Sequence, residues 1–481
     1  MAKTADLVIR NGRIVSPDGI VAASLAIRDG VIAAIGDDDL MPPATDSLDA
    51  AGCHLLPGII DSHVHFREPG YEYKEDWGTG TAAAACGGVT TVLEMPNTHP
   101  PTADLAALAL KQAAARRLAH VDYGIYGLLD EHNLDKLEAL HEAGVVGFKC
   151  FMGNTFGDLP APSDGAMLEA FEIIARLGKR IVVHAENPSI MARRQAQMEQ
   201  AGRSDPLAHL AARPAICEIE AVSRAIYFAE WTGARLHIAH KSSKDALDIV
   251  RQAKARGVDV TVETCPQYLL LDTEDMKRLG NVMRVNPPIR EPGHAEPLWQ
   301  ALRDGVVDMM ATDHAPHSIA EKTDPNVWRC CCGFPGVETA VPLMLTEVAA
   351  GRISLPHYVK ISSANPAKAW GLYPRKGALQ VGSDADIAMV DLAREGRVRA
   401  EALQSKSKIT PFDGRPLKGM PVATLVRGRV VARDGALVGQ PGWGRAVTQA
   451  MAAPAPRNTD WSSAAIVQTE ILMARARARA Q

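Results

Sequence analysis

Eight short runs of apolar, mostly β-branched residues recur along the middle of the chain, and most of them break into polar loops. Runs of this length, bounded by turn signals, are typical of buried strands. Stretches with helical period lie between them, at Ala103 to Leu118, Ala166 to Leu177, Ile216 to Trp231 and Lys244 to Arg256. The predicted strands lie in 55–60, 89–95, 121–127, 144–149, 180–187, 234–240, 258–264 and 306–314.

Alternation of strand and helix over about 300 residues is the pattern of a closed parallel (β/α)₈ barrel, the TIM barrel, in an α/β fold. We assign this barrel to residues 57–375. In such a barrel the carboxyl ends of the strands build the active site. Polar side chains that follow those strands are therefore the first candidates for function.

The two flanks of the chain have a different pattern. Residues 1–56 and 376–440 contain short alternating runs separated by turn signals such as Asn11-Gly12 and Asp434-Gly435. We expect the two flanks to assemble one small β-sandwich beside the barrel. Residues 441–481 form a C-terminal extension, with a linker at Met451 to Asn458 and a helix at Trp461 to Ala480. A solvated helix or oligomer arm is the favoured interpretation of that helix, ahead of contact with an acidic partner.

Composition narrows the class of protein. The 481 residues are 47% apolar and carry a formal charge of −4, which gives no electrostatic reason to expect binding to nucleic acid or membrane. The amino terminus reads as a charged strand, and no apolar run reaches membrane-spanning length, so we expect a cytoplasmic protein. The eight cysteines have no regular spacing and are expected to be reduced thiols. Cys330-Cys331-Cys332 invites a metal or redox interpretation, but adjacent cysteines chelate one zinc poorly.

Metal-competent residues stand at the ends of five predicted strands. His63 and His65 are two residues apart, so they project from one face of a strand, as a pair of metal ligands must. The simpler alternative is a set of unrelated polar residues that cap core strands. The joint placement of these residues at strand ends favours a metal site there, with His63 and His65 as its first candidate pair.

Five ordered motifs carry a family resemblance. Over residues 1 to about 440 the chain is similar to the cyclic amidohydrolases of the amidohydrolase superfamily, which include dihydroorotases, allantoinases and hydantoinases or dihydropyrimidinases. The resemblance implies a small-molecule cyclic amide substrate and a homo-oligomer, a dimer or tetramer. The motifs are His63-Val64-His65, Gly147 to Phe151, His184 to Asn187, His237 to His240 and Thr312 to His317.

The resemblance also implies a ligand scheme. One metal would be held by His63, His65 and Asp313 and the other by His184 and His240, with Lys149 bridging them as a CO₂-derived carbamate. A free ammonium cannot ligate a cation, but a carbamate offers two oxygen ligands. Zn²⁺ suits the histidine-rich set best.

The ligand scheme implies a mechanism. Two metals would supply a bound hydroxide. Asp313 would then move its proton to the leaving ring nitrogen. His237 is either a support for these ligands or an ordinary core histidine.

The substrate is predicted from a further group of residues. Arg67 and Asn97 resemble the pair that grips the carboxylate in dihydroorotases, and residues 405–412 resemble the ending of those enzymes. Dihydroorotase, an enzyme of pyrimidine biosynthesis that interconverts dihydroorotate and N-carbamoyl-aspartate, is therefore the first expectation. The expected substrate-binding residues are Arg67, Asn97, Asn286, His317, Pro335 and Gly336.

Other residues favour different members of the group. Lys149-Cys150-Phe151 and 263–268 look more like allantoinases, which makes allantoinase the alternative, followed by a hydantoinase-like hydrolase of another cyclic imide or ureide. Gln267 replaces a usual histidine. Asn154 stands where hydantoinases place an oxyanion-stabilising tyrosine, which argues against that activity. A non-catalytic scaffold is disfavoured because all six ligands are present.

Overall fold

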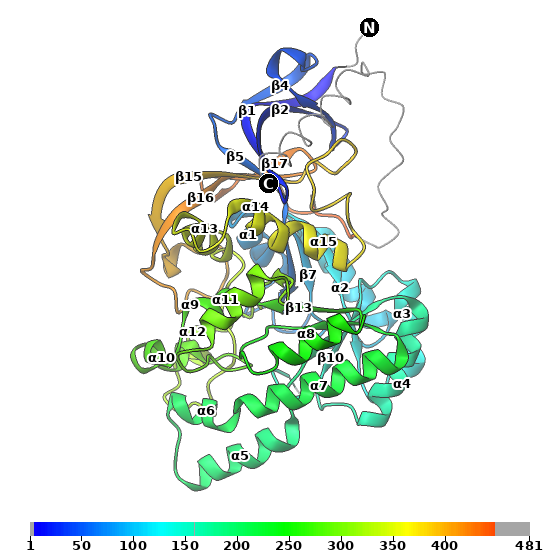
Figure 1. The fold of residues 1–481 in the computed structure, drawn as a ribbon, viewed down its shortest axis with the longest axis vertical. Helices are drawn as coiled ribbons and strands as arrows, with labels where there is room; N and C mark the ends of the chain where they lie inside the picture. Colours follow the sequence, from blue (N-terminus) through cyan, green and yellow to red (C-terminus); the bar gives the residue numbers. More distant parts are fainter. Residues whose placement is uncertain (1–3, 158, 448–481) are drawn as a thin grey trace.

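The computed structural model describes residues 4–157 and 159–447 (Figure 1). The linker and helix predicted beyond residue 450 lie outside these ranges. Within them the protein has a mixed α/β fold with two sets of strands, one parallel and one mainly antiparallel. The parallel strands come from the middle of the chain and the others from its two flanks. The parallel set is β6 (Ile59–Val64), β7 (Val89–Glu94), β8 (Asp122–Ile125), β9 (Gly127–Leu129), β10 (Phe148–Phe151), β11 (Arg180–His184), β12 (Arg235–Ile238), β13 (Val260–Thr264) and β14 (Met309–Met310).

The parallel strands are hydrogen-bonded in chain order. One series runs β6-β7-β8 and the other β9-β10-β11-β12-β13-β14. An isolated parallel bridge between Val64 and His314 connects the end of the last strand to the first, and the His65 N–H donates to the His314 carbonyl at 2.7 Å. The carboxyl ends of the first and last strands therefore lie side by side.

Helices connect these strands, and four of them confirm the predicted helical stretches. The stretch predicted at 103–118 is α2, that at 166–177 is α4, that at 216–231 is α7 and that at 244–256 is α8. The helices are α1 (Trp77–Cys86), α2 (Leu105–Leu118), α3 (Leu137–Glu142), α4 (Asp164–Leu177), α5 (Pro188–Gln200), α6 (Pro206–Ala212), α7 (Ala215–Thr232), α8 (Leu247–Ala255), α9 (Pro266–Leu270), α10 (Thr273–Leu279), α11 (Ala295–Arg303), α12 (Ile319–Lys322), α13 (Ala340–Ala349), α14 (Leu355–Val359) and α15 (Asn365–Ala369). Short 3₁₀ turns lie at Asp38–Leu40, Leu134–Lys136, Gly280–Met283 and Ala400–Ala402, and a π-helical turn at Lys360–Ala364.

The second set of strands joins the two flanks of the chain in one nine-stranded sheet. Its order is β18-β17-β16-β15-β5-β1-β2-β3, with β4 paired to β1. Figure 1 shows the blue strands at the top of the molecule and the orange strands next to them, just below. The sheet consists of β1 (Ala5–Ser16), β2 (Gly19–Arg28), β3 (Val31–Gly36), β4 (Ala44–Asp49), β5 (His54–Pro57), β15 (Ile387–Arg397), β16 (Pro416–Val426), β17 (Arg429–Arg433) and β18 (Ala436–Leu437).

The apolar run 55–60 differs from its prediction, because it forms two strands in two different sheets. Strand β5 pairs with β1 and β15, and β6 begins the parallel set. Gly58 lies between them, where a Cβ atom would come within 2.0 Å of Thr90 Oγ1. The chain thus crosses between sheets at a position that only glycine fits.

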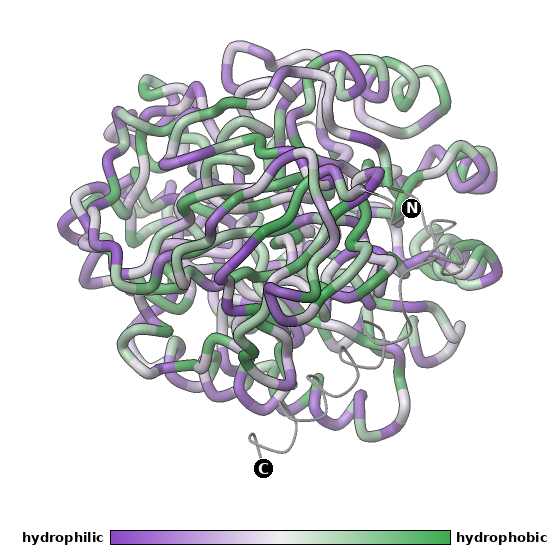
Figure 2. The backbone as a smooth tube through the Cα atoms, turned by 90° about the horizontal axis from the view of Figure 1, so that it is seen from above, coloured by the Kyte–Doolittle hydropathy of each residue, from purple (hydrophilic) through white to green (hydrophobic). Residues whose placement is uncertain are grey.

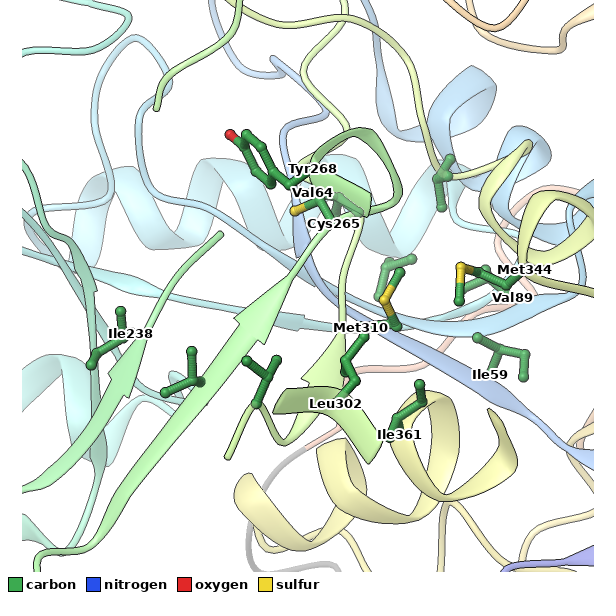
Figure 3. Close-up of a cluster of buried hydrophobic side chains, with 14 of the residues drawn as sticks. Ile59, Val64, Val89, Ile238, Cys265, Tyr268, Leu302, Met310, Met344 and Ile361 are labelled. Carbon is green, nitrogen blue, oxygen red and sulfur yellow. The ribbon is translucent and has the colours of Figure 1, made fainter. Parts of the chain in front are cut away.

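Two of the buried hydrophobic clusters show how this arrangement packs. The larger one fills the space between the parallel strands and their helices; Figure 3 shows part of it, with Ile59, Val89 and Met344 among its members. The smaller one contains side chains from β1 to β3 together with Ile387 and Leu425 of β15 and β16. Seen from above, hydrophobic stretches cross the middle of the molecule (Figure 2). The larger core also includes side chains of the flanking sheet, such as Val15, Leu56 and Val390, so the two sets of strands share part of their apolar interior. The site described next lies at the carboxyl ends of the parallel strands.

Candidate metal centre

All six predicted metal ligands converge at the carboxyl ends of the parallel strands. His63, Lys149 and His184 lie within β6, β10 and β11, and the other three lie within three residues after the ends of β6, β12 and β14. None is more than 8% exposed. Residues as far apart in sequence as His63 and Asp313 meet because parallel strands present their carboxyl ends at one edge.

Three of these residues form a compact group. Asp313 Oδ1 lies 3.1 Å from His65 Nε2 and 3.5 Å from His63 Nε2. Their three ligand atoms lie within 4.8 Å of one another, as the ligands of one ion require. Burial is the main cause that lowers the pKa of His63 to about 4 and that of His65 well below its usual value. Both imidazoles are therefore neutral, which is the metal-binding form.

His184 and His240 form a second group beside the first. His184 Nδ1 lies 3.0 Å from His240 Nε2, and the ring of His240 is 5.2 Å from that of His63. Burial lowers the pKa of both imidazoles, that of His240 well below its usual value. His184 Nδ1 and His240 Nε2 therefore face each other as nitrogens of two neutral imidazoles. Lone pairs on these two atoms would suit a second cation.

Lys149 provides the test of whether these residues fit a bridged pair of metals. Its side chain is fully buried, and its Nζ atom has no hydrogen-bond partner among the described residues. Burial lowers the pKa of the amine to about 8. A buried and unsatisfied amine is costly unless it serves a function. A neutral amine is also the form that reacts with CO₂, so the residues fit the predicted carbamate bridge.

The outward-facing nitrogens of three histidines are held by other side chains. His65 Nδ1 lies 2.7 Å from Asn97 Oδ1, and His63 Nδ1 lies 2.5 Å from Glu263 Oε1. His184 Nε2 lies 2.8 Å from Glu186 Oε2. These contacts place the proton on the nitrogen that faces away from Asp313 and His240, so the inner nitrogen is free to bind a metal.

Glu263 and Glu186 are site residues that the sequence analysis missed. The sequence analysis names no candidate ligand in the predicted strand 258–264, yet Glu263 stands at its end and contacts a candidate ligand histidine. Burial opposes the charge of Glu263, but His63 and His237 hold the pKa of its carboxyl well below the usual value. A carboxylate at the end of a buried strand, in the same position as the ligands of the neighbouring strands, was the signal available. Glu263 also contacts His237, whose Nε2 lies 3.0 Å from Glu263 Oε2, so this histidine is one contact away from a candidate ligand, as its supporting role would require.

A small cavity opens at the six candidate ligands. Three of the predicted substrate-binding residues line it, namely Arg67, Asn97 and Asn286. His317, Pro335 and Gly336 are not among its lining residues. The Gly336 N–H instead donates to the ring of His314 at 3.1 Å. The rest of the lining consists of Phe151, Thr155, Phe156, Val285, Ala315 and Cys332.

Arg67 is the most unusual of the cavity residues. It is 1% exposed, and its Nε donates to the Pro316 carbonyl at 3.2 Å while Nη2 lies 3.2 Å from His317 Nε2. Its Nη1 has no hydrogen-bond partner in the part of the chain that the structure describes, and burial lowers its pKa to about 10. The guanidinium also stacks over Phe156, 4.5 Å from the ring centre. Arg67 thus lines the cavity and keeps one donor, Nη1, without a partner among the described residues.

Three site residues adopt a left-handed backbone conformation. The φ angles are +65° at Arg67, +37° at His240 and +50° at Asp313. Non-glycine residues pay about 1–3 kcal/mol for such a conformation and cluster at functional sites. Here the turn comes directly after a strand and aims each side chain into the cavity.

Two positions that distinguished family members have clear contacts. Gln267 Nε2 donates to the Thr312 carbonyl at 3.2 Å and so fixes the residue before Asp313. Asn154 contributes only its carbonyl, which accepts from Arg213 at 2.7 Å, while Thr155 and Phe156 of the same loop line the cavity. No tyrosine is among the residues that line this cavity in the described chain.

The sequence of most of this chain is similar to that of known hydrolases. Residues 54–431 match the sequence profile of the amidohydrolase family. The chain belongs to the amidohydrolase family. It is 40% identical to the L-hydantoinase of Paenarthrobacter aurescens over 92% of this chain and 98% of that protein, and 40% identical to the allantoinase of Rubrobacter xylanophilus over 91% and 96%.

Solved structures agree with the sequence relatives. An L-hydantoinase (dihydropyrimidinase) from Arthrobacter aurescens superposes with a TM-score of 0.91 at 40% identity, over 92% of this chain and 100% of that one. A dihydropyrimidinase from Brevibacillus agri superposes with a TM-score of 0.87 at 32% identity, over 93% and 99%. These names support the alternative expectations of allantoinase and hydantoinase better than the first expectation of dihydroorotase. The argument from Asn154 against hydantoinases is thereby weakened.

Two further expectations can be compared with the structure. All eight cysteines are free thiols, and Cys332 lines the cavity. No helix within 4–157 or 159–447 is long and apolar enough to cross a membrane.

Proposed function

We propose that the protein is a binuclear-metal hydrolase that opens the ring of a cyclic ureide of the hydantoin or allantoin class. The observation that carries this proposal is the unpartnered amine of Lys149, buried among four neutral histidines and Asp313. Such a set is costly for a protein that binds nothing there. It is inexpensive for one that holds two cations and a carbamate.

Each residue has a role in this reaction. His63, His65 and Asp313 would hold one divalent ion, His184 and His240 the other, with carbamylated Lys149 between them and Zn²⁺ as the best-suited metal. When bound, the two ions would supply a water that ionises near neutral pH and would polarise the scissile carbonyl. Burial raises the pKa of the Asp313 carboxyl, which suits a group that takes a proton and returns it to the leaving ring nitrogen.

The free polar atoms of the cavity favour allantoin within this class. Arg67 Nη1 offers an unused donor, and Asn286 Oδ1 is a buried acceptor with no partner among the residues described. The ureido arm of allantoin carries both a carbonyl and N–H groups, so it can satisfy both atoms. The carboxylate of dihydroorotate would satisfy Arg67 but carries no donor, so only the ring N–H groups of that substrate could reach Asn286.

The fold proposal accompanies the functional one. We propose that β6 to β14 close into the (β/α)₈ barrel expected for residues 57–375, with β8 and β9 as two parts of one strand. The flanking sheet would be the β-sandwich built from residues 1–56 and 376–440. The bridge between Val64 and His314 and the core shared by β1 to β3 with β15 and β16 support this division.

A substrate panel tests the functional proposal. Protein reconstituted with Zn²⁺ and bicarbonate is assayed with allantoin, hydantoin, dihydrouracil and dihydroorotate at one pH. We expect kcat/KM for allantoin or hydantoin to exceed that for dihydroorotate by at least about 100-fold, and Asp313→Asn to lower turnover by about two orders of magnitude or more. Preferred turnover of dihydroorotate would overturn the substrate class, and an unchanged Asp313→Asn variant would overturn the mechanism.

A further inference from the structure

Glu263 contacts candidate ligands of both metal sites. It stands on β13, a strand that contributes no ligand, and its side chain is 1% exposed. One carboxylate oxygen, Oε1, lies 2.5 Å from His63 Nδ1 and accepts from the His240 backbone N–H at 3.3 Å. Oε1 therefore touches one candidate ligand of each metal.

The second carboxylate oxygen is also fully engaged. Oε2 accepts from Ser62 Oγ at 2.9 Å and lies 3.0 Å from His237 Nε2. His237 is itself fixed by Thr261 Oγ1, 2.8 Å from its Nδ1. The carboxylate thus has partners on β6 and on β12, the latter paired directly with its own strand β13, and it cannot rotate without breaking several buried hydrogen bonds.

These contacts define what the carboxylate does to the ligands. Acceptance by Oε1 fixes the proton of His63 on Nδ1, so Nε2 points its lone pair toward Asp313. The contact with the His240 backbone holds that residue in its left-handed conformation at φ +37°, from which its ring faces His184. One negative charge behind both sites also makes the cluster more attractive to cations.

We propose that Glu263 is the positioning residue that organises both metal sites at once, from a strand that supplies no ligand. This inference rests on the metal centre of the proposed function. It predicts that loss of the Glu263 charge weakens both metal-binding steps together, although Glu263 touches neither metal nor substrate.

The test measures metal affinity directly by competition with a chromogenic chelator. In Glu263→Gln the shape is kept but the charge is lost, so we expect both stepwise Zn²⁺ affinities to fall by about 10-fold, within the 10–100-fold range of such partners. The visible spectrum of the Co²⁺-loaded variant should shift, because the geometry around the ion changes. Excess metal should restore most of kcat with little change in KM, a rescue that a merely unstable variant would not show.

Two matched variants separate positioning from general damage. Glu94→Gln alters a buried glutamate at the end of β7 that pairs with Lys111 and touches no candidate ligand, and should leave both affinities within about threefold. Ser62→Ala removes one partner of Oε2 while leaving Oε1 in place, and should have an intermediate effect.

The outcomes are distinguishable. A wild-type protein that binds no metal would overturn the proposed function. A wild-type protein that binds two metals, with Glu263→Gln unchanged in both affinities and in its Co²⁺ spectrum, would overturn this inference alone. Circular dichroism would detect a Glu263→Gln variant that binds metal poorly only because it is unfolded. In that case Glu263→Asp, which keeps the charge, is tested instead. It should keep at least part of the metal affinity if the inference holds, and none if the inference fails.

Discussion

The side-chain oxygen of Asn97 lies 2.7 Å from Nδ1 of His65, so a residue expected to grip substrate instead supports a candidate metal ligand. Asn97→Ala removes the acceptor that fixes the His65 proton. We expect Zn²⁺ affinity to fall about 10–100-fold, while KM measured at saturating metal changes little. Asn97→Asp keeps an acceptor oxygen and should restore most of the affinity. A raised KM with normal metal affinity would return Asn97 to the role predicted from the sequence.

The buried amine of Lys149 predicts opposite effects on stability and function. Lys149→Met keeps an unbranched side chain but removes the unpartnered Nζ, so the metal-free variant should be more stable than metal-free wild type by about 1–3 kcal/mol. It should bind no bridging carbamate and lose most activity. Urea unfolding in chelator measures the first effect, and mass spectrometry with bicarbonate measures the added CO₂. A Lys149→Met protein with two tightly bound metals and normal turnover would remove Lys149 from the site.

Arg67 predicts a difference between two substrates that share a ring. Arg67→Met removes the free Nη1 donor, and we expect KM for allantoin to rise about 5–10-fold, which corresponds to one hydrogen bond of roughly 1 kcal/mol. The contact exists in both ground and transition states, so kcat should change little. Hydantoin lacks the ureido arm and serves as the internal control. Equal losses for both substrates would place Arg67 on the ring rather than on the arm.

Glu338 predicts how stability depends on pH. Burial raises the pKa of its carboxyl to about 7, and its Oε2 accepts only from the Gln404 backbone N–H among the residues described. The folded protein therefore holds this proton between pH 4.5 and 7 while the unfolded chain releases it, so stability falls as pH rises through that range. Glu338→Gln keeps an acceptor and should be more stable than wild type by about 2 kcal/mol at pH 8, with the advantage gone at pH 4. Parallel urea titrations at the two pH values measure it, and an equal advantage at both would exclude the carboxyl as the cause.

The meeting of the six candidate ligands could be predicted because each stands at or just after the end of its own strand, while the choice of these six came from the family resemblance. His63 and His65 follow from a two-residue period, and Asp313 from its place after an apolar run. Glu263 and Asn97 could not be assigned in the same way, because their roles depend on which strands are neighbours and on their register. The contact between Glu263 and His63 joins residues 200 positions apart.

The fold shows the same limit. Helices such as α4 and α7 were predictable from their period, but the run 55–60 gave no sign that it divides between two sheets. That division depends on Thr90 and Asp386, which surround Gly58 only in the folded protein. The substrate class could not be predicted for a similar reason. The sequence shows that residue 67 is an arginine, but only the folded structure shows that its Nη1 lacks a partner among the described residues.

The pairing of β5 with β15 has a consequence for how the protein is made. Strand β5 ends at Pro57, and its partner begins at Ile387, about 330 residues later. At roughly 5–20 residues per second, a ribosome needs roughly 15–65 s to deliver that partner. Throughout this interval β5 has one open edge in the nascent chain, and such edges recruit other strands. The parallel strands emerge first, so the candidate metal centre can assemble while the flanking sheet still waits for its second half.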